Sequence, residues 1–104
     1  MTGLGLVTPL GCGVTGVWER LINGESGISP ITDFNVDDLP AKIAGQVPRG
    51  EAAGALNLET VVPPKELKKM DDFILYAIAA ADQAVADAGW TPEDEAALER
   101  TGVM

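Results

Sequence analysis

The feature that most restricts the fold of this chain is a stretch in which apolar residues recur at steps of three and four. They are Met70, Phe73, Ile74, Ala77, Ile78, Ala81, Val85 and Ala88. This spacing places them on one face of an α-helix. We expect Pro63-Pro64 to begin the helix and Gly89 to end it. A helix this long and this rich in alanine is normally buried in a large fold, and 104 residues offer little to cover it.

The run TGLGLVTPLG, which opens at Thr2, has the pattern of a buried strand over residues 2–7. Gly3 and Gly5 interrupt the strand, and we expect them where another backbone approaches too closely to leave room for a side chain. Residues 8–11, Thr-Pro-Leu-Gly, predict a turn.

Neither end of the chain has the polar residues that are usual at a domain edge. Residues 101–104, TGVM, resemble the start of another apolar strand. We therefore expect residues 1–104 to be the amino-terminal part of a larger domain, truncated at the carboxyl end and also at the amino end.

Helix and strand signals alternate along the chain and predict an α/β fold. A first helix is predicted by the spacing of Val14, Val17, Trp18, Leu21 and Ile22. Gly24 suits the position just past its end. Loop signals run from residue 25 to 40, and residues 41–47 alternate as in a strand. Residues 48–64 are rich in Gly, Ala and Pro, and we expect mainly a surface excursion there.

Composition excludes several classes of function. The net charge of −9 argues against nucleic-acid binding, which needs a surplus of cations. The longest apolar run, residues 73–81, is far shorter than the roughly 20 residues that cross a bilayer. The chain has no histidine, so chemistry that depends on its own His is excluded. Its single Cys cannot form an internal disulfide and fits a reducing cytoplasm, where we expect the protein.

Cys12 is the one candidate nucleophile, but it lies in Gly11-Cys12-Gly13, which we interpret as a loop. A reactive thiolate needs a helix amino-terminus and a nearby cation or His, so we interpret Cys12 as a small loop residue. Gly3 and Gly5 do not form a dinucleotide-binding loop, because G-x-G-x-x-G needs glycine where Thr8 stands. Tight packing of strand and turn is the better explanation.

Acidic residues pair at Asp37/Asp38 and Asp71/Asp72 and cluster at Glu93-Asp94-Glu95. Such groups can bind a hard cation, but no ligand spacing here is diagnostic, and we predict no metal site. For the last cluster, a helix capped by Thr91 and begun by Pro92 is sufficient, because acids in a first turn complement the helix dipole.

Lys65, Lys68 and Lys69 concentrate cations in an otherwise acidic chain. On a helix Lys65 would share a face with the other two, which makes a positive spot suited to an acidic partner. The alternative is a solubilising helix surface that nearby acids neutralise, and charge pattern alone favours this alternative.

Four blocks carry a resemblance to a known family. They are TGLGLVTPLG, WERLINGESGI, PITDFNVDDLPAKIAGQV and KKMDDFILYAIAAADQAVADAGW. In this order they resemble the β-ketoacyl-acyl-carrier-protein synthases, and most closely the ketosynthase II branch. The resemblance implies a partial thiolase fold: the first part of the amino-terminal half of an αβαβα sandwich. Residues 48–62 depart from the family pattern.

The resemblance also implies an activity. Similar enzymes extend an acyl chain by decarboxylative condensation of malonyl carrier protein with an acyl thioester, usually as homodimers. Their catalytic Cys, two His and Lys have no counterpart here, so we assign no catalytic residue to this chain and expect it to be inactive alone. No cofactor is implied, because the phosphopantetheine arm belongs to the carrier protein.

In similar synthases, basic residues just before the Met-Asp step dock the acidic acyl carrier protein. Lys65, Lys68 and Lys69 precede Met70-Asp71 in that way, and the family context favours docking over a solubilising surface. Two other classes stay open. One is a non-catalytic partner of the chain-length-factor kind, and the other is a free-standing carrier-binding module. We expect the isolated chain to be molten, because its long apolar helix has too few partners.

Overall fold

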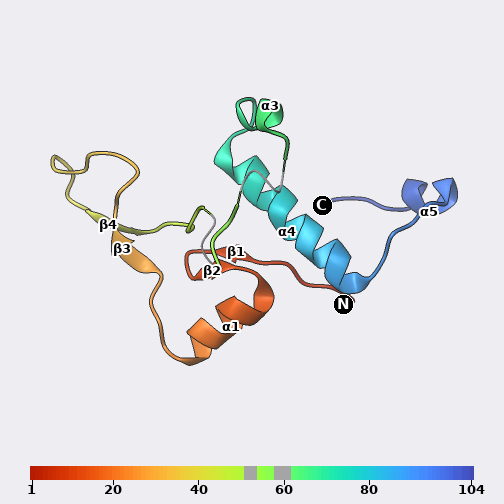
Figure 1. Cartoon of the computed structure of the whole chain (residues 1–104), viewed down its shortest axis with the longest axis horizontal. Coiled ribbons are helices and arrows are strands. Elements are labelled where there is room, and N and C mark those ends of the chain that lie inside the picture. Colours follow the sequence, from red (N-terminus) through yellow and green to blue (C-terminus); the bar gives the residue numbers. More distant parts are fainter. Residues whose placement is uncertain (51–53, 58–61) are drawn as a thin grey trace.

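The computed structural model describes residues 1–50, 54–57 and 62–104. Two strand pairs lie on either side of the first helix in the sequence, and further helices follow them (Figure 1). In order they are β1 (Val7–Thr8), β2 (Gly11–Cys12), α1 (Val14–Ile22), β3 (Ile28–Pro30), β4 (Ile43–Gly45), α3 (Pro64–Leu67), α4 (Asp72–Ala88) and α5 (Glu95–Glu99).

The first two strands form a hairpin that closes through Pro9 and Leu10, as the turn at residues 8–11 predicts. Thr8 pairs with Gly11 in an antiparallel register. The Thr8 hydroxyl accepts a hydrogen bond from the Leu10 amide at 3.2 Å and donates one to the Gly11 carbonyl at 3.1 Å. Gly11 has a φ of +140°, which favours glycine at this corner.

The predicted strand over residues 2–7 is wrong in extent, because regular strand covers only Val7–Thr8. The preceding residues run along α4. The Leu4 amide donates to Asp87 Oδ2 and the Leu6 amide donates to Gln83 Oε1, both at 3.0 Å. Side chains of α4 therefore bond the backbone groups that a neighbouring strand would otherwise bond.

Gly3 and Gly5 lie where the amino-terminal segment crosses α4. A Cβ on Gly3 would overlap the Ala84 carbonyl oxygen, and a Cβ on Gly5 would overlap the Ala80 carbonyl oxygen. The prediction that another backbone approaches these two positions is confirmed.

Helix α1 agrees with its prediction in place and in length. Gly24 follows its end with a φ of +73°, in the left-handed region. Val17 is the buried residue of the helix, whereas Trp18, Leu21 and Ile22 are exposed. The Arg20 guanidinium donates to the Leu10 carbonyl at 2.5 Å and so ties α1 to the hairpin.

Strands β3 and β4 form a second antiparallel pair, which projects as an arm from the rest of the chain (Figure 1). The prediction of a strand within residues 41–47 is confirmed over Ile43–Gly45. The prediction of loop from residue 25 to 40 is wrong at Ile28–Pro30, which pairs with β4. This strand is short and ends in a proline, so its sequence lacks the usual strand pattern.

The helix predicted to start at Pro63-Pro64 is two helices. The prolines begin only the single turn of α3, and α4 begins at Asp72. Between them Asp71 is extended, with φ −75° and ψ 159°, so the helical backbone is interrupted there. The predicted stop is confirmed, because Gly89 is left-handed with a φ of +64° and ends α4.

The two buried residues of α4 lie outside the predicted apolar face. The helix buries Leu75 and Ala79, whereas Phe73 and Val85 of the predicted face are exposed. The helix is apolar almost all round, so periodicity alone does not select one side. Ala79 lies beside Cys12 of the hairpin and Leu56, whereas the segment that precedes the hairpin crosses α4 at Ala80, Ala84 and Ala88.

Residues 48–64 are not simply a surface excursion. Leu56 is only 2% exposed, and Val62 is also buried. The Leu56 amide donates to the Pro48 carbonyl at 2.7 Å, and the Gly54 carbonyl accepts from the Cys12 amide at 2.8 Å. The segment therefore closes one side of the small core. The rest of this prediction, at residues 51–53 and 58–61, lies outside the described residues.

Helix α5 begins later than predicted. Its N-cap is Asp94, whose carboxylate accepts from the Ala96 amide at 3.4 Å. Thr91 therefore does not cap it. Aspartate is as good an N-cap as threonine, so the prediction selected the wrong one of two capping residues that lie three positions apart.

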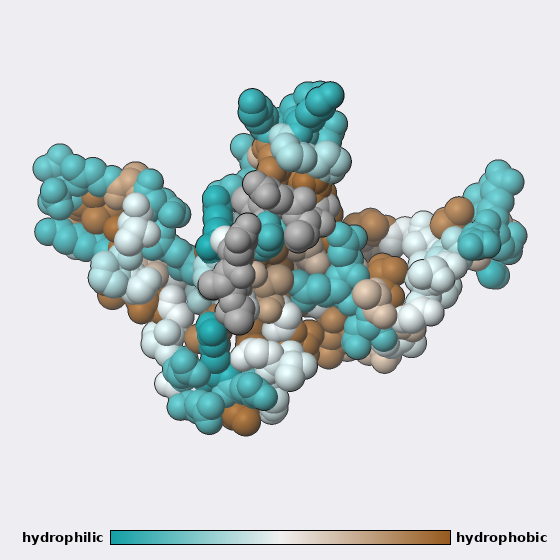
Figure 2. Space-filling model, in the orientation of Figure 1, coloured by the Kyte–Doolittle hydropathy of each residue, from teal (hydrophilic) through white to brown (hydrophobic). Residues whose placement is uncertain are grey.

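The chain is more open than a compact domain of its size. Its accessible surface is 7907 Å², against about 5,500 Å² expected for a compact monomer of its mass. Its radius of gyration is 16.3 Å, against about 13 Å for a compact domain of this length. Figure 2 shows apolar residues at the surface of several elements. Within the described ranges, no helix is long and apolar enough to cross a membrane.

Candidate functional site

The three lysines lie on a short irregular segment, residues 63–71, which we call the lysine turn. Pro63 precedes α3 in an extended conformation, and Pro64 takes the first helical position. The Lys69 amide bonds the Glu66 carbonyl at 3.0 Å, which continues a tight turn beyond the helix. Local proline and turn chemistry therefore shapes this segment.

The lysine turn brings its lysines together, as predicted. All three are exposed, and with Pro64 they line a shallow, open depression of about 420 Å³. The helical basis of that prediction holds only for Lys65, because α3 ends at Leu67. Lys68 and Lys69 reach the same depression through the turn that follows.

Within the described residues, no ion pair engages the lysines of this cluster. The ion pair found there is that of Arg49 with Asp72. Glu66 and Asp71 are close in sequence, but neither carboxylate forms an ion pair with a lysine in that part of the chain. The cluster can thus attract an acidic partner.

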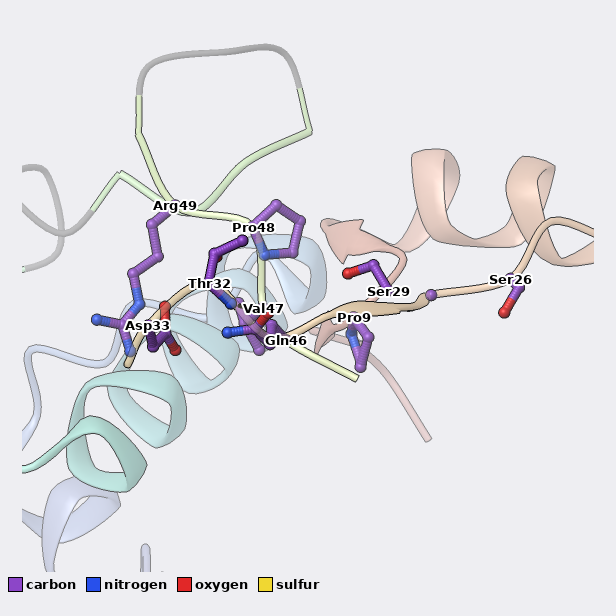
Figure 3. Close-up of a pocket in the computed structure, with 10 residues that line it drawn as sticks. Pro9, Ser26, Ser29, Thr32, Asp33, Gln46, Val47, Pro48 and Arg49 are labelled. Carbon is purple, nitrogen blue, oxygen red and sulfur yellow. Dashed lines mark hydrogen bonds between the residues drawn. The ribbon is translucent and has the colours of Figure 1, made fainter. Parts of the chain in front are cut away.

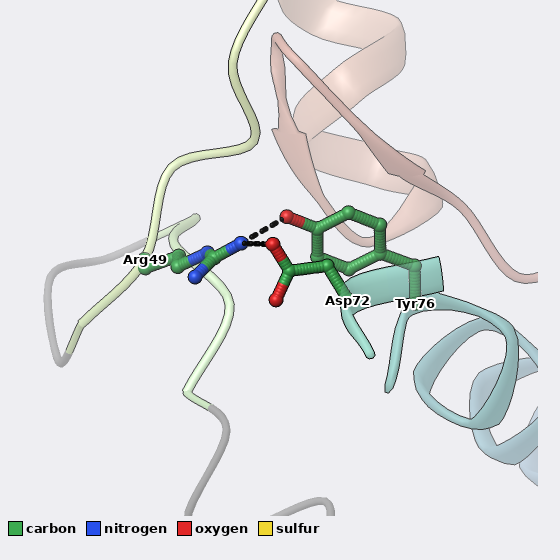
Figure 4. A network of polar contacts seen from close by, with 3 residues as sticks. All are labelled: Arg49, Asp72 and Tyr76. Carbon is green, nitrogen blue, oxygen red and sulfur yellow. Dashed lines mark hydrogen bonds and ion pairs between the residues drawn. The ribbon is translucent and has the colours of Figure 1, made fainter. Parts of the chain in front are cut away.

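A polar network adjoins the lysine turn at the start of α4 (Figure 4). One guanidinium nitrogen of Arg49, Nη2, donates to Asp72 Oδ2 and to the Tyr76 hydroxyl, both at 2.6 Å. The guanidinium carbon lies 5.6 Å from the centre of the Tyr76 ring. The hydrogen bonds to Tyr76 and then to Asp72 raise the pKa of Arg49, so its charge persists at any pH at which proteins fold.

Sequence reasoning missed Arg49. A signal was available, because Arg49 is a cation in a stretch of glycine, alanine and proline within an acidic chain. Asp72 and Tyr76 are four residues apart and share a helix face, so one cation can reach both. Which cation does so depends on tertiary contacts between residues far apart in sequence.

Cys12 lies in β2, not in a loop as predicted, and is half-buried. Its sulfur accepts a hydrogen bond from Gln83 Nε2 at 2.8 Å. A cavity of about 290 Å³ reaches it, lined in part by Leu56, Ala79 and Asp82. The thiol thus helps to join the hairpin to α4.

A second, wider groove of about 450 Å³ lies between the β3–β4 arm and the hairpin turn. Ser26 lies at one end of it and Asp33 and Arg49 at the other (Figure 3). Gln46 bonds the Thr32 amide at 3.3 Å and holds the arm in register there. The groove is open and mostly polar, and its lining contains no cysteine to act as a nucleophile.

The predicted acidic pairs play different parts. The Asp37 amide bonds the Asn35 side chain at 3.0 Å in a local turn, and Asp38 is exposed. Of the pair at 71 and 72, only Asp72 has a charged partner in the part of the chain that the structure describes. Across that same part, no group of three acidic or cysteine side chains is arranged to hold a metal ion.

The arrangement of these elements is that of a partial thiolase fold, the first part of the amino-terminal half of an αβαβα sandwich, as the sequence predicts. The solved structure of "the ishigamide ketosynthase/chain length factor" superposes with a TM-score of 0.70 at 34% identity. That match covers 88% of this chain and 21% of the solved chain.

The "Beta-ketoacyl synthase, N-terminal domain" family matches residues 1–104. 3-oxoacyl-[acyl-carrier-protein] synthase 2 of Rhizobium meliloti is 49% identical over 100% of this chain and 25% of its own length. The mitochondrial 3-oxoacyl-[acyl-carrier-protein] synthase of Arabidopsis thaliana is 40% identical over 99% of this chain and 25% of its own. The chain belongs to the β-ketoacyl synthase family and spans about a quarter of the length of these relatives.

Proposed function

We propose that this chain is the amino-terminal quarter of a 3-oxoacyl-[acyl-carrier-protein] synthase II. The complete protein condenses malonyl carrier protein with an acyl thioester. A cysteine thiolate outside this chain accepts the acyl group from its carrier. Loss of carbon dioxide from the malonyl group leaves a carbanion equivalent, which attacks the acyl carbonyl and releases the thiolate. Two histidines, a lysine and backbone amides outside this chain assist these steps and stabilise the oxyanion.

The part played by this chain is to dock the acyl carrier protein on the lysine turn. The observation that carries this proposal is the grouping of Lys65, Lys68 and Lys69, exposed around one depression on a chain of net charge −9. A local excess of positive charge attracts an acidic partner to that place, and the net negative charge of the rest of the chain repels it elsewhere. The phosphopantetheine arm arrives with the carrier, so the enzyme needs no cofactor of its own.

The test is carrier binding by the complete polypeptide that contains this chain. Replacing all three lysines by Glu raises the carrier Kd more than about tenfold at low salt, because three favourable charge contacts become repulsive. Lys42→Glu is the matched control, since Lys42 is an exposed cation beside β4 and away from the lysine turn. An unchanged Kd for the triple variant, or an equal loss for Lys42→Glu, contradicts docking at the lysine turn.

Salt provides a second measurement of the same contact. The wild-type Kd rises with ionic strength, because salt screens exposed charges over about 10 Å at 0.1 M. The triple variant shows a much flatter dependence. Equal salt dependence in the two proteins would assign the attraction to charges elsewhere.

A non-catalytic partner of the chain-length-factor kind is the second candidate function. The observation that favours it is the similarity to a solved structure whose title names a chain length factor with its ketosynthase. Both candidates use the same docking surface. Formation of 3-oxoacyl carrier protein by the complete polypeptide alone identifies the synthase, and carrier binding without condensation identifies the partner.

We further propose that the complete protein is a cytoplasmic homodimer. The open surface of this chain, 7907 Å², leaves apolar area for the rest of the protein and a second subunit to cover. Sedimentation of the complete polypeptide tests the dimer. Fractionation of the source cells tests the compartment.

A further inference from the structure

The lysine turn has no buried residue of its own to fix its position. Contacts of the residues at its two ends hold it in place. Val62, just before it, is buried in the small core. Asp72, just after it, is held by Arg49 at 2.6 Å. Among the described residues, the backbone hydrogen bonds of the segment are its own turn bonds and those that the Asp71 carbonyl accepts from the Ile74 and Leu75 amides of α4. The direction of the segment therefore depends on the two anchors at its ends and on the first turn of α4.

The second anchor leads back to the core through the backbone. Leu56, 2% exposed, pairs with Arg49 in a parallel bridge. Its carbonyl accepts from the Gly50 amide at 3.0 Å and its amide donates to Pro48, so the backbone on both sides of Arg49 is held. The Arg49 side chain then spans to α4. A buried residue thereby holds the guanidinium against the first turn of the helix that follows the lysines.

The aromatic ring makes this anchor more than a simple surface ion pair. The guanidinium bonds both Asp72 and Tyr76, which are one helical turn apart on α4. Two acceptors fix its direction, and the ring adds a cation–π contact, while the side chains of Arg49 and Asp72 stay 39% and 59% exposed. Such a contact holds the start of α4 in one orientation relative to the core.

We propose that Arg49 is a positioning residue for carrier docking. Through Asp72 and Tyr76 it fixes the first turn of α4 and with it the direction of Lys65, Lys68 and Lys69. This inference rests on the proposed docking function of the lysine turn. A surface that is already ordered loses less conformational entropy when its partner binds, so the anchor favours docking without touching the carrier.

The obvious alternative is that Arg49 acts only as a further positive charge. The two explanations predict opposite signs for Asp72→Asn. Removing an acid makes the surface more positive. If Arg49 acts only through its charge, Asp72→Asn therefore tightens the binding of an acidic carrier. Loss of the anchor instead frees the lysine turn and weakens binding.

The experiment measures carrier binding by the complete polypeptide with Asp72→Asn, and Asp71→Asn is the matched control. Asp71 is exposed, and its carboxylate does not cap α4. We expect the Kd for the carrier to rise about threefold for Asp72→Asn, because the free energy lost is about that of one good surface ion pair. KM for the carrier substrate rises in proportion, and kcat stays unchanged. For Asp71→Asn we expect the Kd to stay the same or to fall.

A charge exchange separates positioning from damage to the fold. Arg49→Asp alone weakens binding, and Arg49→Asp with Asp72→Arg recovers most of the loss, because the pair is restored with its ends exchanged. Hydrogen exchange at residues 63–71 becomes faster in Asp72→Asn and returns toward the wild-type rate in the exchanged pair.

The possible results are distinct. Equal Kd values for Asp72→Asn and Asp71→Asn, with a weakened triple lysine variant, overturn the positioning role and leave docking intact. A triple lysine variant that binds like the wild type overturns docking and the positioning role together. A Kd raised in Asp72→Asn alone and rescued by the exchanged pair supports both.

Discussion

The two faces of α4 have similar composition but different surroundings. Leu75 is 3% exposed, and Phe73, two residues away, is 70% exposed. Ala79 is buried on the first face, whereas Ala77 is exposed on the second. The helix thus presents apolar side chains on both sides, and this chain covers only one of them.

The difference shows what burial depends on. On the covered face, Ala79 lies beside Cys12 of the hairpin and the buried Leu56. Gly3 and Gly5 let another backbone cross the carboxyl half of the helix, at Ala80, Ala84 and Ala88. Phe73, in the first turn, is as apolar as Leu75 but stays exposed. A helix that is apolar all round belongs inside a larger fold. We expect the remaining three quarters of a full-length synthase to cover the exposed face.

The strongest test of this comparison removes the remaining part of the protein. The isolated 104-residue chain will show no sharp unfolding transition and will bind a hydrophobic dye such as ANS. Its surface of 7907 Å² leaves too little burial for cooperative folding. Circular dichroism in the far and near ultraviolet, followed with urea, measures this. A compact monomer with one sharp transition would show that the exposed face needs no cover.

A second test compares the two faces within the complete polypeptide. Phe73→Ala will lower the free energy of unfolding by about 3 kcal/mol or more if the exposed face becomes covered, as we expect. Leu75→Ala, on the buried face, is the matched substitution and will cost about 3 kcal/mol. Urea denaturation measures both. A change within about 0.5 kcal/mol for Phe73→Ala would mean that this face stays in solvent in the complete protein.

Sequence patterns predicted the elements whose cause is local. The turn at residues 8–11 and the stops at Gly24 and Gly89 follow from backbone preferences of single residues. The fold class followed from the family resemblance, which the comparisons confirm. The grouping of the lysines followed from their spacing, although a turn and not one helix brings them together.

The features that sequence patterns did not predict share a different cause. Each depends on contacts between distant parts of the chain. The buried Ala79 of α4 lies beside Cys12 and Leu56, which are far from it in sequence. Leu56 is buried although its neighbours have little periodicity. Arg49 finds Asp72 and Tyr76 only once the chain is folded. A pattern within one window of sequence cannot contain such information.

The smallest effects come from glycines, and they test whether the amino-terminal segment covers the carboxyl half of α4 in the complete protein. In the complete polypeptide, Gly5→Ala will lower the free energy of unfolding by about 2 kcal/mol, because its Cβ meets the Ala80 carbonyl oxygen and the backbones must separate. Gly16→Ala is the control, since no atom lies within 4 Å of a Cβ there. Within α1 this change raises stability by about 1 kcal/mol through helix propensity. If both substitutions were stabilising, the amino-terminal segment would not lie against α4 in the complete protein. The difference between the carboxyl half of α4, which that segment covers, and the exposed Phe73 would then apply only to the chain in isolation.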